Sequence, residues 1–183
     1  MKKTAFRNSS KTAIGGIIAA LSIVLMLLTS IIPTLTYALP AAAGILLIIV
    51  VIEIDKKWAA AVYFVVSLLS ILLLADKEAA VMYAMFFGYY PILKQIFESK
   101  LSKTLSWILK FTVFNIAVVI AFLITTYVFQ IPFDEMETYG MIAAIGLLGL
   151  GNIVFIIYDI ALTRLITIYM YRWRKGFRRI FKF

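Results

Sequence analysis

Polar side chains at helical spacing stand inside two long apolar stretches of this sequence, and they are the first candidates for chemistry. Tyr83, Tyr90 and Lys94 fall on one face of a helix, because their steps of seven and four residues match the α-helical period. Asn152 and Asp159 share one face of a later apolar stretch. Polar groups inside a membrane are costly, so each of them needs a partner or a function.

Helix geometry brings Lys94 and Asp159 to similar depths. At 1.5 Å per residue they lie about 22 Å and about 30 Å from the outer ends of their apolar stretches. We therefore predict an ion pair between Lys94 and Asp159, with Lys110 and Arg164 as competing partners of the two charges.

Two asparagines, Asn115 and Asn152, are predicted at a level slightly above this pair, where they can hydrogen-bond across helices. We interpret Lys94, Asn115, Asn152 and Asp159 as a structural polar layer that fastens three helices. The alternative is a polar site for a solute or a coupled proton.

The segment FFGYYPILK, residues 86–94, is unusual inside an apolar helix. Pro91 lacks the N–H that a helix uses, and Gly88 allows a neighbouring helix to approach closely. We predict that Gly88 and Pro91 form a hinge or fastening point near one end of a membrane span.

Composition excludes several kinds of chemistry. The chain of 183 residues has neither cysteine nor histidine, so thiol, disulfide, Cys/His metal and histidine acid–base chemistry are absent. No phosphate-binding loop or paired membrane carboxylates are present, and we expect neither an enzyme nor a cofactor nor a metal. The net charge of +9 is better explained by basic loops facing anionic lipid than by nucleic acid.

Apolar segments follow one another along the chain, which is 64% hydrophobic with a mean hydropathy of +1.03. Each is long enough to cross a bilayer core of about 30 Å. They run over residues 13–33, 37–54, 58–75, 79–97, 106–130 and 139–170. We predict an all-α integral membrane protein with six transmembrane helices in one compact bundle, because irregular backbone cannot face lipid.

Basic residues set the expected orientation. With both termini inside, 17 of the 18 lysines and arginines fall on the cytoplasmic side, and only Lys77 falls outside. The chain then divides into a basic cytoplasmic N-terminus (1–12), the membrane domain (13–170) and a basic aromatic cytoplasmic tail (171–183). Pro33 and Pro40 bracket the first outer loop, and Pro132 begins the third.

Small residues four apart mark the first helix. Gly15 with Ala19, and Gly16 with Ala20, allow close helix approach. They predict either packing within the bundle or docking of a partner.

The segments KTAIGGIIAALSIVLMLLTSIIP, FFGYYPILK and YDIALTRLITIYMYR resemble an uncharacterised bacterial group of S-component-like proteins of energy-coupling factor (ECF) transporters, over nearly the whole chain. The resemblance implies a subunit of the bacterial plasma membrane that captures a small solute from outside. It also implies a pocket toward the outer side, a transmembrane coupling protein and ATPase subunits as partners. The family's Ala-x-x-x-Ala motif in the first helix is replaced here by Gly15/Gly16 with Ala19/Ala20.

Two functions are therefore expected. The first is solute capture for uptake, with substrate-binding residues that the sequence does not identify. The alternative is a stand-alone membrane protein for lipid handling or assembly, with a cytoplasmic face that binds anionic lipid.

Overall fold

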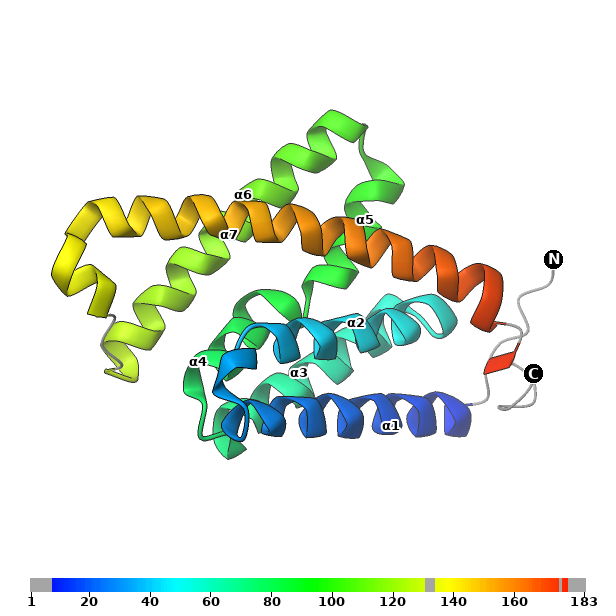
Figure 1. Ribbon diagram of the computed structural model, residues 1–183. Helices are drawn as coiled ribbons and strands as arrows, with labels where there is room; N and C mark the ends of the chain where they lie inside the picture. Colours follow the sequence, from blue (N-terminus) through cyan, green and yellow to red (C-terminus); the bar gives the residue numbers. More distant parts are fainter. Residues whose placement is uncertain (1–7, 131–133, 175, 178–183) are drawn as a thin grey trace.

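The computed structural model describes residues 8–130, 134–174 and 176–177 of the chain. All regular structure in these residues is helical, as Figure 1 shows. The main helices are α1 (Asn8–Leu27), α2 (Ala38–Glu53), α3 (Lys56–Leu73), α4 (Lys77–Met82), α5 (Tyr90–Lys100), α6 (Lys103–Leu123) and α7 (Asp134–Ile168). Shorter helical turns are η1 (Leu28–Ser30), η2 (Pro33–Leu35), η3 (Tyr83–Phe87), η4 (Ile124–Val128) and η5 (Tyr169–Trp173).

The all-α prediction is confirmed for this part of the chain. Four helices are long and apolar enough to span a membrane, consistent with a membrane protein: Ser9–Leu28, Lys56–Leu73, Lys103–Val128 and Ile145–Trp173. Large apolar side chains on these helices are exposed, for example Ile17, Phe64, Ile116 and Ile157. Helices that are apolar on their outer faces are suited to lipid rather than water.

Helices α1, α2 and α3 pack side by side, and α7 bends near its beginning and then runs across the bundle (Figure 1). Helix α6 runs diagonally away from the first three helices. Successive long helices run in opposite directions, so α1 begins and η5 ends at the same side of the view. This alternation is what a chain that crosses a layer repeatedly requires.

Polar side chains cap the N-termini of the helices that follow short connections. The Asp55 carboxylate accepts a hydrogen bond from the Trp58 N–H at 2.8 Å, and Asp76 accepts one from the Ala79 N–H at 2.9 Å. Ser102 caps α6 in the same way. These side chains satisfy backbone donors that have no partner inside the first helical turn.

The expected single span over 79–97 is wrong in one respect, because the structure divides it into α4, η3 and α5. The Gly88 N–H reaches back five residues to the Tyr83 carbonyl at 2.8 Å, so the helix widens into a π-helical turn. Pro91 has no N–H to continue the ladder, and α5 restarts with Pro91 in its first turn.

Neighbouring helices hold this break in place. The Tyr63 hydroxyl of α3 donates to the Ala84 carbonyl at 2.7 Å. On α2, a Cβ added to Gly44 would lie 2.3 Å from the Phe87 carbonyl oxygen, so only glycine fits beside the turn. Gly88 is enclosed as well, since a Cβ there would lie 2.5 Å from the Tyr63 ring.

The small residues of α1 divide into two sets. Gly15 is buried, and a Cβ there would lie 3.3 Å from Val62 of α3. Ala19 is partly buried and packs against the core. Gly16 and Ala20 are exposed, and a Cβ on Gly16 would have nothing within 4 Å. The first pair thus packs within the bundle, and the second pair faces outward.

Some expectations lie outside the described residues. They concern Pro132, the first seven residues and most of the basic aromatic tail, namely 175 and 178–183.

Candidate functional site

A cluster of charged side chains lies between α5, α6 and α7, with Asp159 at its centre. The Lys94 Nζ lies 2.6 Å from Asp159 Oδ1, and the Lys110 Nζ lies 3.1 Å from Oδ2. The Tyr90 hydroxyl donates to Oδ1 at 2.5 Å. Lys94, Lys110 and Asp159 are all buried, so the structure brings together the two residues that helix spacing paired and one of their two competing partners. Arg164, the other competing partner, is exposed.

Glu98 completes the cluster and was missed in the sequence. Its Oε1 accepts from the Lys94 Nζ at 2.7 Å and from the Lys110 Nζ at 2.6 Å. The Glu98 side chain keeps 43% of its surface exposed, whereas that of Asp159 keeps 4%. The sequence does contain a signal for Glu98, because Lys94 and Glu98 are four residues apart on one helix and such pairs face each other.

The charges in this cluster balance. Two ammonium groups meet two carboxylates, and the Asp159 carboxylate receives three donors. A buried ion pair is tolerated only when its charges are paired and its remaining hydrogen-bonding capacity is used. The arrangement therefore suits fastening three helices better than proton exchange, which needs a group with spare capacity.

The two asparagines form a separate contact. Each side-chain amide donates to the other's oxygen, at 2.9 Å from Asn115 and 3.0 Å from Asn152. Each also donates to the backbone carbonyl four residues earlier. Asn152 precedes Asp159 by seven residues, or about 10 Å along the helix. Phe155 lies between them and stacks on Phe114 at 4.7 Å between ring centroids. The structure thus has two polar levels with an aromatic layer between them.

An apolar crevice of about 340 Å³ lies beside the break between η3 and α5. Its walls come from α3, the η3–α5 region and α6, and include Tyr63, Ala84, Tyr89, Val113, Ala117 and Ile120. The crevice is open on the outer face of α6, where Ile116 and Ile120 line it and are exposed. Gly88 and Pro91 signalled this break, whereas the residues that line the crevice from other helices gave no signal in the sequence.

Two hydrogen bonds join the α1–α2 connection to the start of α4. The Thr36 hydroxyl donates to Asp76 at 2.9 Å, and the Tyr37 hydroxyl donates to Glu78. The α1–α2 connection is thereby held to the start of α4.

A further ion pair joins the end of η5 to the end of α2. The Arg174 Nε lies 2.8 Å from Glu53 Oε1, and the Glu53 side chain is fully buried. Neither residue stood out in the sequence, since both are next to loops where charges are ordinary.

Comparison of the chain with protein-family models, curated proteins and solved structures finds no match.

Proposed function

We propose that this chain is a non-enzymatic solute-binding subunit of the bacterial plasma membrane, with six passes and both termini in the cytoplasm. The observation that carries the proposal is the break in the fourth pass, directly beside the crevice lined by Tyr63 and Tyr89. The break is a π-helical turn followed by a restart at α5, and π-helical turns inside helices are frequent at functional sites.

Interrupted helices are a common device for binding solutes within membranes, because their ends and loosened backbone can meet a ligand. Here the crevice walls are mainly aliphatic and aromatic, with α6 contributing Val113, Ala117 and Ile120. The solute expected from these walls is small and mainly apolar. The charge cluster is a less suitable site, because its donors and acceptors already satisfy one another.

We propose six passes because the helix directions alternate and because two further elements, α2 and the pieces from Lys77 to Lys100, approach the length of a membrane span. Helix α2 has 16 residues, about 24 Å, which is slightly short of a bilayer core. The pieces from Lys77 to Lys100 together form the fourth pass. The charge bias of the connections supports an inner position for both termini.

Partners are proposed from the resemblance to ECF S-components: a transmembrane coupling protein and ATPase subunits. The outward-facing Gly16 and Ala20 are the candidate docking surface, because small residues let another helix approach closely.

The alternative function is lipid handling or assembly through a basic cytoplasmic face. A groove at the end of α7 favours this alternative. The alternative function is compatible with solute capture.

Gentle purification followed by mass spectrometry tests the proposal. We expect coupling and ATPase chains, and a small molecule, to be recovered with the wild type. Ala20→Leu should reduce recovery of the partner chains without removing the small molecule. A stable wild-type chain recovered with neither partner nor small molecule would argue against solute capture.

A further inference from the structure

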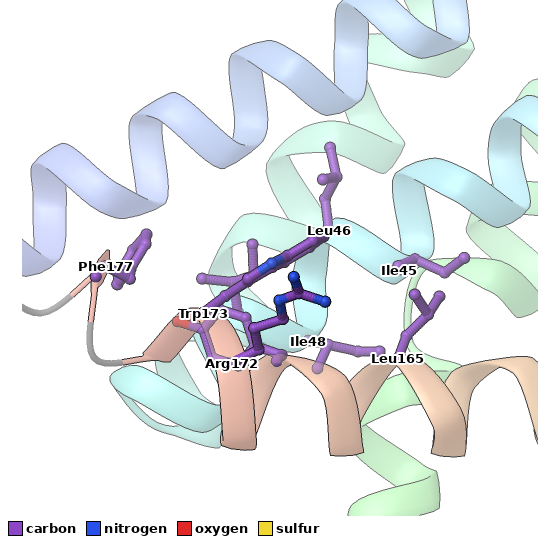
Figure 2. A pocket seen from close by; sticks show the side chains of 10 residues that line it. Ile45, Leu46, Ile48, Leu165, Arg172, Trp173 and Phe177 are labelled. Carbon is purple, nitrogen blue, oxygen red and sulfur yellow. The ribbon is translucent and has the colours of Figure 1, made fainter.

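A groove of about 480 Å³ runs between α2 and the last turns of α7 and η5. Ile45, Leu46 and Ile49 of α2 form one wall, and Leu165, Arg172 and Trp173 contribute to the other. Figure 2 shows the Arg172 side chain and the Trp173 ring extending from the α7 side toward α2.

The groove is apolar along its length and cationic at one end. Leu165 and Arg172 are seven residues apart, so the walls extend about 10 Å along the helix from the apolar part to the charged part. Trp173 is 60% exposed beside the charge. An arginine and a tryptophan at the end of an apolar helix are typical of the membrane–water boundary.

We propose that this groove binds one anionic phospholipid of the inner leaflet. An acyl chain lies along Ile45 and Ile49, and the phosphate lies against the Arg172 guanidinium. The guanidinium fork matches two oxygens of a phosphate, and anionic lipids are concentrated in the cytoplasmic leaflet. The inference depends on the proposed orientation of the chain but not on solute binding.

Two neighbouring arginines differ in a way that supports this occupant. Arg174 is engaged with the buried Glu53 at 2.8 Å, and this ion pair holds the end of η5 against the end of α2. Arg172 is exposed, and among the described residues it forms no ion pair. One arginine thus fixes the walls of the groove, and the other is available to an anion.

Trp173 provides a direct probe, because it is one of three tryptophans in the chain. A variant with Trp58→Phe and Trp107→Phe leaves Trp173 as the fluorophore. The protein would be reconstituted in phosphatidylcholine vesicles with a minor fraction of brominated phosphatidylglycerol or, in parallel, brominated phosphatidylcholine. We expect half-maximal quenching at an about fivefold lower fraction of the anionic lipid.

Arg172→Gln should remove this preference, whereas Arg164→Gln should keep it, because Arg164 is exposed on α7 but does not line the groove. High salt should weaken the preference. The comparison of the two lipids uses protein in which Arg172 and Arg164 are both present. It therefore remains valid even if one of the arginine variants fails to fold.

Equal quenching by the two brominated lipids would overturn the proposal, since it indicates ordinary surrounding lipid. An unchanged preference in Arg172→Gln would overturn it too. Quenching that appears only after removal of residues 178–183 would show that the chain's own tail fills the groove instead.

Discussion

Asp159 shows how a single carboxylate is made tolerable between helices of an apolar protein. It receives Lys94, Lys110 and Tyr90 as donors, and Glu98 supplies the second negative charge that the two ammonium groups need. Each helix of the group contributes a charge, so the cluster specifies which helices pack together as well as how deeply they sit.

Removing the central carboxylate should be far more damaging than removing the peripheral one. Asp159→Asn removes the buried carboxylate that accepts from three donors and leaves the two ammonium groups with only the half-exposed Glu98, so we expect a loss of about 3–5 kcal/mol in unfolding free energy. Glu98→Gln should cost about 1 kcal/mol or less, because that side chain is 43% exposed and water can replace it. Denaturation in mixed micelles measures both, and equal losses would contradict the assigned roles.

The asparagine pair allows a test by double substitution. Asn115→Leu alone leaves the Asn152 amide without its partner across the helices, and we expect a loss of about 1 kcal/mol. The double variant with Asn152→Leu should lose no more than either single variant, because no unpaired amide remains. Strictly additive losses in the same denaturation assay would show that the two residues act independently.

At the scale of elements, the interrupted segment α4–η3–α5 depends on close contact with α2. Gly44→Ala places a Cβ where the Phe87 carbonyl already lies, and we expect a loss of about 1–3 kcal/mol in unfolding free energy. Gly16→Ala is the matched control, because its Cβ meets nothing and alanine favours a helix by about 0.5–1 kcal/mol. A Gly44→Ala variant as stable as the wild type would contradict this packing.

Helix positions were predictable from the sequence because apolar runs, prolines and capping residues are local signals. The Lys94–Asp159 proximity followed from helix rise alone. By contrast, the register of η3 depends on contacts with Tyr63 and Gly44, which lie on other helices. Pro91 marked a weak point but not its place, since the helix already widens at Tyr83.

The crevice and the groove were not predictable for a related reason. Each is bounded by side chains from helices whose relative placement no local pattern specifies. Glu98 and Arg174 were missed because charges near loops are ordinary, and their partners are distant in the chain: Glu98 reaches Lys110, and Arg174 reaches Glu53.

At the scale of the whole molecule, two arrangements can be distinguished. The proposed six-pass arrangement and one in which only the four longest helices cross the membrane place residues 57 and 75 on opposite sides. The chain has no cysteine, so single cysteines can be introduced cleanly at exposed positions. With six passes, Thr34→Cys and Ala75→Cys should react with an impermeant maleimide in intact cells, whereas Lys57→Cys and Ser99→Cys should react only after permeabilisation. If only the four longest helices cross, the reactivities at 57 and 75 are exchanged, and that result would contradict six passes.

Retention of a small molecule at the crevice beside the η3–α5 break tests the central claim most directly. Ala117→Phe fills the crevice, whereas Val119→Phe on the same helix is exposed and does not line it. Mass spectrometry of gently purified protein should find the same small molecule with the wild type and with Val119→Phe, and little or none with Ala117→Phe. Equal recovery from Ala117→Phe and Val119→Phe, in folded protein, would contradict a solute site at the crevice.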